Sequence, residues 1–288
     1  MSWLRNSGYR LAVAVLLLLA VPARAQEPVL SVGSWRGETV AAGITLYRAS
    51  FDSSLFGANQ YLCVLVVAPG ARFDIVPAGD GTLEKTTSLA ARSEAVAAVN
   101  GSFFNMRAPY GSVNYLRVDH EDLAPNQLNP KAPGSGRTLQ QGGAVATFHG
   151  GLYVLKGDDL RTWERYIAAE DVVTTGPVLI AGGEPEPVRP AKFNTDRHPR
   201  TAAGRRADGT VILVAADGRS EQAAGLTMAE LQQVMLALGC RDAINLDGGG
   251  STAMVVRGEV VNHPSDNRQF DADGERVVAN AIVVSVNR

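Results

Sequence analysis

The chain is poor in the side chains that most often bind zinc or form disulfides. It holds four histidines, none of them in a ligand-spaced pair, which argues against a zinc site. Its two cysteines, Cys63 and Cys240, could pair in an oxidising compartment. However, Cys63 lies in the apolar run 62–67, and free cysteine is common in such surroundings. The sequence therefore predicts no metal site of this kind and leaves the disulfide open.

An excess of charge of one sign is also missing. The 27 Lys and Arg residues nearly balance the 29 Asp and Glu residues, the net charge is −2, and no basic run stands out. Nucleic-acid binding needs a basic patch that neutralises phosphates, so no nucleic-acid partner is expected. The apolar content of 45% is ordinary for a globular protein with a real core. The 30 glycines and 14 prolines indicate many turns and hence a β-rich fold.

The apolar run near the start, residues 11–21, is too short to span a bilayer. Two arginines precede it, and Ala-Arg-Ala at 23–25 has the small-x-small form of a cleavage site. Residues 1–25 are therefore predicted to be a signal peptide, and no nearby cysteine offers a site for a lipid anchor. We expect a periplasmic or secreted protein with no stable membrane insertion after cleavage; an uncleaved anchor is the alternative.

Short apolar segments separated by turn residues predict strands along the chain. The first are residues 38–48 and 60–68, with 72–76 after a Pro-Gly turn. A further strand at 95–99 runs into a polar loop. Residues 119–137 carry proline and glycine without periodicity, so a long loop is expected there.

The clearest helix covers residues 226–239, with a capping box at its start and one apolar stripe. It connects strands expected at 210–215 and 243–246. If these two strands run parallel, Asp217 and Asp247 follow them at the same edge of the sheet. Ligands bind at the carboxyl ends of such strands, so both carboxylates could approach one site.

Together these elements predict an α+β fold. We expect a β-rich mixed-sheet core with flanking helices, organised as a single main domain. An N-terminal β-rich segment, residues 26–89, is expected to pack on the main domain, residues 90–288.

The most informative stretch is residues 243–252, Ala-Ile-Asn-Leu-Asp-Gly-Gly-Gly-Ser-Thr. Glycine adopts positive φ without steric cost and lets a ligand approach bare backbone. A string of free N–H groups beside Asp247, Ser251 and Thr252 would suit an anionic or oxygen-rich ligand. The alternative is a tight turn between two strands, which needs only one or two glycines.

Two other polar segments suit a sugar or phosphate ligand. In the loop 100–105, one phenylalanine could form a platform for a sugar ring while an asparagine holds its hydroxyls; alternatively, both phenylalanines plug the core. In the segment 197–201, two arginines and a histidine could clamp an anion. The alternative there is an exposed charged loop.

Other chemistries fit the sequence less well. A serine hydrolase using Ser251, His198 and Asp217 would have its histidine before its serine, and the segment after Ser251 reads as a strand rather than the helix of a nucleophile elbow. Residues 271–275, Asp-Ala-Asp-Gly-Glu, are like a calcium loop but lack its full spacing. We therefore expect no cofactor, with calcium left open.

Short motifs between residues 90 and 286, each weak alone, are specific in combination. They are Val-Asn-Gly-Ser-Phe-Phe (99–104), Thr-Gly-Pro (175–177), His-Pro-Arg-Thr-Ala (198–202), Asp-Gly-Arg (217–219), Gly-Leu-Thr (225–227), Asn-Leu-Asp-Gly-Gly-Gly-Ser-Thr (245–252), Asn262 with Pro-Ser-Asp (264–266), and Arg-Val-Val-Ala-Asn (276–280). In this order they resemble the phosphodiester glycosidase domain family. The early mature residues show no family pattern.

The resemblance implies a hydrolase that cleaves a sugar from phosphate at the anomeric oxygen, in an envelope or extracellular glycan. Asp247 is the first candidate for the catalytic carboxylate and Asp217 the second. Arg200, Arg276 and the glycine amides are expected to hold the phosphate. The non-enzymatic alternative is a periplasmic glycan-binding or exopolysaccharide-assembly module. The sequence specifies neither the sugar nor the oligomeric state.

The resemblance also implies a set of substrate-binding residues. We expect these to be Asn100, Ser102, Phe103, Phe104, Thr175, Gly176, His198, Arg200, Thr201, Asn245, Gly248, Gly249, Gly250, Ser251, Thr252, Asp266, Arg276 and Asn280.

Overall fold

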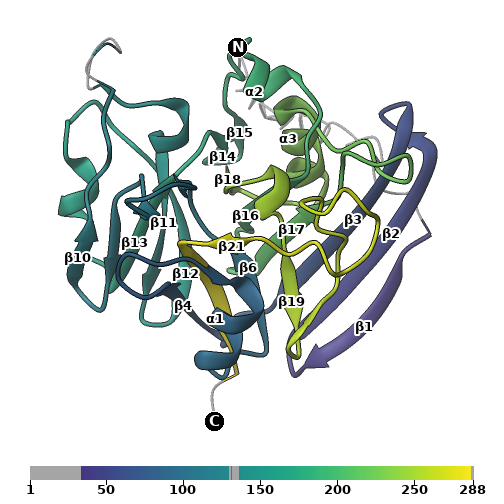
Figure 1. Ribbon diagram of the computed structural model, residues 1–288, viewed down its shortest axis with the longest axis horizontal. Coiled ribbons are helices and arrows are strands. Elements are labelled where there is room, and N and C mark those ends of the chain that lie inside the picture. The colour runs from purple at the N-terminus through teal and green to yellow at the C-terminus, as the bar shows by residue number, and fades with distance from the viewer. Residues whose placement is uncertain (1–33, 130, 132–135, 287–288) are drawn as a thin grey trace, which may run out of the picture.

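Three antiparallel sheets enclose the core of the protein in the computed structural model, which describes residues 34–129, 131 and 136–286 (Figure 1). The predicted signal peptide lies outside these residues. The β-rich character is confirmed, but the expected mixed sheet is wrong, because all the strand pairings described within the sheets are antiparallel. Helices are few, with one covering the outer face of each of two sheets.

The largest sheet has eight strands and includes the N-terminal residues. Residues 38–48, predicted as one strand, form parts of two strands, because Gly43 at φ 73° allows a two-residue turn between Ala41 and Ile44. The third strand pairs with a strand that precedes Asp217, so the N-terminal strands belong to the sheet that carries the site. In spatial order the strands are β1 (Arg36–Ala41), β2 (Ile44–Leu55), β3 (Ala58–Val67), β17 (Val211–Ala216), β16 (Arg200–Arg205), β18 (Asp242–Asn245), β14 (Val178–Ala181) and β15 (Glu184–Pro185).

The order of this sheet decides which loops meet at its edge. Because β16 pairs antiparallel with both β17 and β18, those two strands run parallel to each other without being neighbours. The carboxyl ends of β17 and β18 therefore lie at the same edge as the amino end of β16. The expectation that Asp217 and Asp247 share an edge is confirmed, with Arg200 between them.

Two five-stranded sheets complete the core. One consists of β20 (Glu259–Val260), β19 (Met254–Val256), β6 (Ala97–Asn100), β22 (Asn280–Ser285) and β4 (Arg72–Pro77). The other consists of β10 (Glu121–Ala124), β9 (Leu116–Val118), β13 (Asp171–Thr175), β11 (Gly143–Phe148) and β12 (Gly151–Lys156), so the loop predicted at 119–137 contains a short strand. Two small ladders pair β21 (Val277–Val278) with β5 (Glu84–Lys85), and β7 (Phe104–Asn105) with β8 (Gly111–Ser112).

The centre of the largest sheet is buried on both faces. Leu213 and Ile244 point into a core shared with the other two sheets, whereas Val214 and Ala243 point into a second core under the helix α3 (Met228–Ala237). Burial on both faces explains why β17 is a continuous apolar run rather than an alternating one.

The helices are close to those expected. α3 has the predicted capping box, in which the Thr227 hydroxyl accepts a hydrogen bond of 3.1 Å from the Glu230 N–H. A second helix, α1 (Thr86–Arg92), packs on the sheet containing β6 and β22. A short α2 (Lys192–Thr195) and the 3-10 turns η1 (Leu139–Gln141), η2 (Trp163–Tyr166) and η3 (Gly249–Ser251) complete the elements.

The two cysteines do not pair. Cys63 is buried on β3, in the core that the three sheets share, and Cys240 is buried after α3, in the core on the other face of the largest sheet. Both are free thiols, so no disulfide contributes to the fold.

Asn100 joins two of the sheets beside the site. Its fully buried side chain donates a hydrogen bond to the Asp247 carbonyl (2.7 Å) and accepts bonds from the Thr201 hydroxyl (2.7 Å) and the Ala253 N–H (3.1 Å). In addition, the Asp247 N–H donates to the Gly101 carbonyl at 2.9 Å. The backbone of Asp247 is therefore held at both its N–H and its carbonyl by the end of β6.

Replacing Asn100 by alanine should destabilise the fold strongly. Asn100→Ala leaves three buried polar groups without a partner, so we expect a loss of about 3 kcal/mol in the free energy of unfolding, measured with urea. The matched control is Asn59→Ala, whose hydrogen bonds are exposed and which should cost less than about 1 kcal/mol. Equal losses in the two variants would contradict this role for Asn100.

Candidate functional site

The candidate site is the loop that follows β18. Asp247 is partly exposed there, and its Oδ1 accepts a 2.9 Å hydrogen bond from the N–H of Gly248. Gly249 has φ 61°, which favours glycine, and the short η3 turn follows at once. The turn directs the chain back into the core at β19. The loop thus presents one carboxylate from the edge of the largest sheet.

Two arginines cover the glycines of this loop. A Cβ on Gly249 would stand 2.9 Å from Nη2 of Arg219, and a Cβ on Gly250 would collide with the guanidinium of Arg276. Arg276 also forms an ion pair with Asp266. The glycines are therefore required because side chains of other residues would displace these cations.

Burial raises the pKa of Asp247 from the ordinary value of 3.8 to about 6, although the nearby Ser251 hydroxyl, the Gly248 N–H and the guanidiniums of Arg276 and Arg219 act to lower it. The pKa of Arg219 is lowered, first by burial and next by Arg276. The two arginines therefore repel each other while both attract the carboxylate. Such a pair of cations favours an anion held between them.

The backbone amides of the loop are less available than the sequence suggests. The Gly248 N–H bonds to the Asp247 carboxylate, and the Gly249 N–H donates to the Pro199 carbonyl at 2.8 Å. The Ser251 N–H donates to the Gly248 carbonyl at 3.2 Å. The expected string of free N–H groups is therefore wrong, and the positive charge at this site comes from the arginine side chains.

Unpartnered polar atoms gather around this loop. Buried polar side-chain atoms normally have hydrogen-bond partners, so a group without them calls for an explanation. Of the eleven such atoms in the described residues, six belong to the loop or to motifs flanking it. They are His198 Nδ1, Asn245 Oδ1, Ser251 Oγ, Thr252 Oγ1, Ser265 Oγ and Arg276 Nε.

Asp217 has a different environment from Asp247. It is fully buried, and it accepts hydrogen bonds from the Asn262 side chain (2.9 Å), the His263 N–H (3.0 Å) and His263 Nδ1 (2.7 Å). Burial raises the pKa of Asp217, and the bonds from His263 and Asn262 oppose that rise. Asp217 therefore holds the 262–263 segment, which leaves Asp247 as the carboxylate that a substrate can reach.

The geometry also argues against a serine hydrolase. Asp217 pairs with His263, whereas Nδ1 of His198 has no partner and neither does the hydroxyl of Ser251. Burial, followed by the charges of Arg200 and Arg219, lowers the pKa of His198. The Ser251–His198–Asp217 arrangement weighed from the sequence is therefore not assembled.

Arg200 does not face a phosphate site. It is 1% exposed and donates to the carbonyls of Leu226 (2.9 Å), Phe193 (2.6 Å) and Asp196 (3.0 Å). Burial lowers the pKa of Arg200 to about 10, and the nearby charge of Arg219 acts in the same direction. The expectation that Arg200 clamps the phosphate disagrees with this geometry. Arg219, from the Asp-Gly-Arg motif, is instead the arginine that covers Gly249, and the motif was the signal for it.

Asn262, which was not among the expected site residues, bonds both Asp217 and the Thr252 carbonyl and so ties the loop to β17.

The remaining expected residues fall into buried and exposed groups. Fully buried residues whose side chains or backbone support the loop are Asn100, Ser102, Thr175, Gly176, Thr201, Asn245 and Asn280. Those with at least partial exposure are Phe103, Phe104, His198, Gly248, Gly249, Asp266 and Arg276, while Gly250, Ser251 and Thr252 are buried within the loop itself.

The two phenylalanines of the 100–105 loop separate. Phe104 packs against the core under α1, whereas Phe103 meets the ring of Phe193 edge-on at 5.9 Å. Phe193 in turn lies under the guanidinium of Arg200. Phe104 therefore belongs to the core, and Phe103 is the ring nearer to the α2 segment.

The described residues contain no group of three or more His, Cys, Asp and Glu side chains placed to hold a metal ion. In the segment considered for calcium, Glu275 accepts from the N–H and hydroxyl of Thr87 (2.8 and 2.7 Å), and Asp271 accepts from Asn267 (2.8 Å) and from the Asp273 N–H (3.0 Å). These carboxylates hold the loop to itself and to α1. Across residues 34–286, excluding the short gaps, no helix is long and apolar enough to cross a membrane.

The chain is similar to several known proteins in sequence. It is 38% identical over 89 residues to the SPbeta prophage-derived uncharacterized protein YomE of Bacillus subtilis, and 40% identical over 79 residues to the mouse N-acetylglucosamine-1-phosphodiester alpha-N-acetylglucosaminidase. These stretches cover 31% and 27% of this chain but only 13% and 15% of those relatives.

Two solved structures share the fold. The catalytic domain of the zebrafish N-acetylglucosamine-1-phosphodiester alpha-N-acetylglucosaminidase, auto-inhibited by its pro-peptide, has a TM-score of 0.63 at 16% identity and covers 89% of both chains. A hypothetical protein from Synechocystis has a TM-score of 0.58 at 17% identity, over 88% of this chain and 64% of that one. The profile of the phosphodiester glycosidase family matches residues 93–285, which include Asp247 and both covering arginines, and the chain belongs to this family of hydrolases.

Proposed function

We propose that this protein hydrolyses sugar 1-phosphodiesters, cleaving the link between a sugar and phosphate in an envelope or extracellular glycan. The observation that carries the proposal is the placement of Arg219 and Arg276 over the glycine loop beside Asp247. A phosphodiester carries one negative charge, which two guanidiniums can hold with several hydrogen bonds. The family membership supports the same reaction class.

Asp247 supplies the carboxylate at the anomeric centre. With a pKa of about 6 it is mostly ionised at neutral pH, and it stands next to the two phosphate-holding arginines. Positive charge in the substrate develops at the anomeric carbon as the bond to phosphate breaks, and a nearby carboxylate stabilises that charge. The phosphate leaves as a monoester anion held by the arginines, and water forms the new bond to the anomeric carbon and gives up one proton, which the released phosphate can take up. The reaction therefore does not require a second carboxylic acid.

Different residues contact different parts of the substrate. The guanidiniums fix the phosphate, and the partly exposed ring of His198, next to the Pro199 carbonyl that holds the loop, offers a hydrogen-bonding group for the sugar. A periplasmic or secreted location, proposed from the N-terminal segment, places the enzyme where such glycans occur.

Asp247→Asn should abolish turnover without loss of stability. We expect kcat on a chromogenic sugar phosphodiester to fall by about a hundredfold or more. The folded-state pKa of Asp247 is raised above its unfolded value, so ionisation at pH 7 opposes folding, and the melting temperature should stay the same or rise.

Asp159→Asn, at an exposed carboxylate, is the control and should retain full activity. Near-normal turnover by Asp247→Asn would contradict a catalytic role. An unmodified protein that binds the substrate but never turns it over would instead indicate the glycan-binding module.

The pH profile should follow Asp247. Because protonation removes the charge that assists the reaction, kcat/KM should decline as the pH falls below about 6. Arg219→Gln removes a positive charge that lowers the pKa of Asp247, so the decline should begin at a higher pH as well as from a lower maximum. Arg165→Gln, at an exposed ion pair elsewhere, should leave the profile unchanged. A profile for Arg219→Gln that is unshifted, or shifted to lower pH, would disprove the coupling.

Gly249→Ala tests the close approach of Arg219 to the loop. The positive φ of Gly249 makes alanine cost about 1 kcal/mol in stability, and the new Cβ would also displace the guanidinium. Gly57→Ala is the matched control, because Gly57 has φ 65° and no atom within 4 Å of an added Cβ. Both variants should melt slightly lower, but only Gly249→Ala should lose affinity for a sugar phosphate in calorimetry. Normal binding by Gly249→Ala would mean that this stretch is merely a turn.

A further inference from the structure

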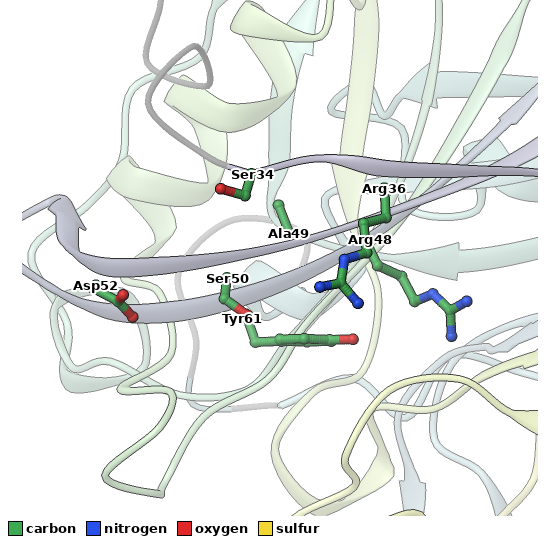
Figure 2. A pocket seen from close by; sticks show the side chains of 7 residues that line it. All are labelled: Ser34, Arg36, Arg48, Ala49, Ser50, Asp52 and Tyr61. Atoms are coloured by element: carbon green, nitrogen blue, oxygen red, sulfur yellow. The ribbon is translucent and has the colours of Figure 1, made fainter.

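A pocket of about 420 Å³ lies on the N-terminal strands, outside the segment that the family profile matches. Figure 2 shows its lining side chains, which come from β1, β2 and β3 and from Ser34, just before β1. Arg36 and Arg48 lie near the hydroxyl end of the Tyr61 ring, while Asp52 lies at the other end of the pocket. The pocket therefore has a cationic end and an end that can accept hydrogen bonds from hydroxyls.

The cationic end carries unbalanced positive charge. Arg48 pairs with Glu38 at 3.1 Å, but Glu38 also pairs with Arg257 at 2.9 Å, so one carboxylate serves two arginines. Arg36 is exposed and forms no ion pair or hydrogen bond through its guanidinium with any described residue. The Arg36 guanidinium, and the N–H groups of Arg48 that Glu38 does not occupy, are thus available to an anion from solvent.

An aromatic wall connects this pocket with the catalytic loop. The Tyr61 ring meets His263 edge-on at 4.8 Å and Phe270 at 5.9 Å, and His263 stacks on Phe270 at 3.7 Å. Phe270 also lines a second surface pocket together with Arg219 and Arg268. Because Arg219 covers Gly249, a row of cationic and aromatic side chains runs from the catalytic loop through Phe270 to Tyr61 on the N-terminal strands.

The wall is fixed to the same sheet edge as the site. Asp217, fully buried at the end of β17, holds His263 by both its backbone N–H and its ring nitrogen. The Asp217 N–H in turn donates to the Tyr61 carbonyl at 3.0 Å. Figure 1 shows the long connection between β20 and β21, which carries His263 and Phe270, crossing beside β17 and β3. The rings are therefore positioned by the buried carboxylate rather than left to loop motion.

We propose that the pocket of Arg36, Arg48 and Tyr61 is an accessory subsite for an acidic oligosaccharide. The anionic group of a sugar unit beyond the one that is cleaved binds the two guanidiniums, and sugar faces pack on Phe270 and Tyr61. The hydroxyls of that unit bond to Ser50 and Asp52 at the other end. A phosphodiester or a uronate carboxylate fits the arginine fork equally. Cleavage of this oligosaccharide at the catalytic loop rests on the proposed function. Its binding at the subsite does not depend on that function.

The experiment compares short and long substrates in the full-length protein. The variant is Arg36→Gln with Arg48→Gln, and the control is Arg165→Gln. The turnover probes are a chromogenic monosaccharide phosphodiester and a three-unit oligosaccharide joined by 1-phosphodiesters. The double variant should lose about tenfold or more in kcat/KM on the three-unit substrate, through KM, and nothing on the monosaccharide. Arg165→Gln should match the unmodified protein on both, and all three proteins should melt alike.

Calorimetry separates the subsite from the reaction and identifies its anion. The probes are the three-unit phosphodiester, a trimer of galacturonic acid and the uncharged maltotriose. Loss of acidic-trimer binding in the double variant supports the subsite even if no sugar phosphodiester is ever cleaved. The acidic trimer that binds the unmodified protein more tightly identifies the preferred anion. Unchanged binding of both acidic trimers, equal binding of maltotriose, or an equal loss on the short and long substrates would overturn it.

Discussion

The site depends on the buried carboxamide of Asn100. This one side chain, at the end of β6, bonds the carbonyl of Asp247, the hydroxyl of Thr201 and the N–H of Ala253, and so links two sheets at the point where the glycine loop leaves the largest one. A loop with three consecutive glycines has little conformational preference of its own. Its shape is therefore imposed from outside, by Asn100 on one side and by Asn262 and Asp217 on the other.

That imposed shape explains the division of labour between the charged residues. Asp247 is kept partly exposed at a position where burial raises its pKa to about 6, and Arg219 and Arg276 stand where glycine leaves them room. Asp217 and Arg200 carry the same charges but are fully or almost fully buried and hold other segments in place. Charged residues of the family motifs thus differ in environment: Asp247 and Arg276 are partly exposed, whereas Asp217 and Arg200 are buried and support neighbouring segments.

The sequence predicted the parts of this arrangement that are local. The α3 helix and the glycine loop after β18 follow from periodicity, capping and glycine content, whereas the parallel run of the strands before Asp217 and Asp247 was only a condition and comes from the order of the sheet. It did not predict which motif residues point to the substrate, because that depends on sheet order: β16 lies between β17 and β18 and buries Arg200. It predicted that residues 26–89 pack on the main domain but not that β3 would hydrogen-bond to β17 within one sheet. Long-range pairing of this kind leaves no periodic signal in either strand.

The most direct test is a crystal structure of the Asp247→Asn variant with an uncut sugar 1-phosphodiester. In such a complex the phosphate oxygens should lie within hydrogen-bonding distance of the Arg219 and Arg276 guanidiniums. The anomeric carbon should lie about 3–3.5 Å from the side chain at position 247. A phosphate bound away from both arginines, or an anomeric carbon beyond reach of that side chain, would contradict this arrangement.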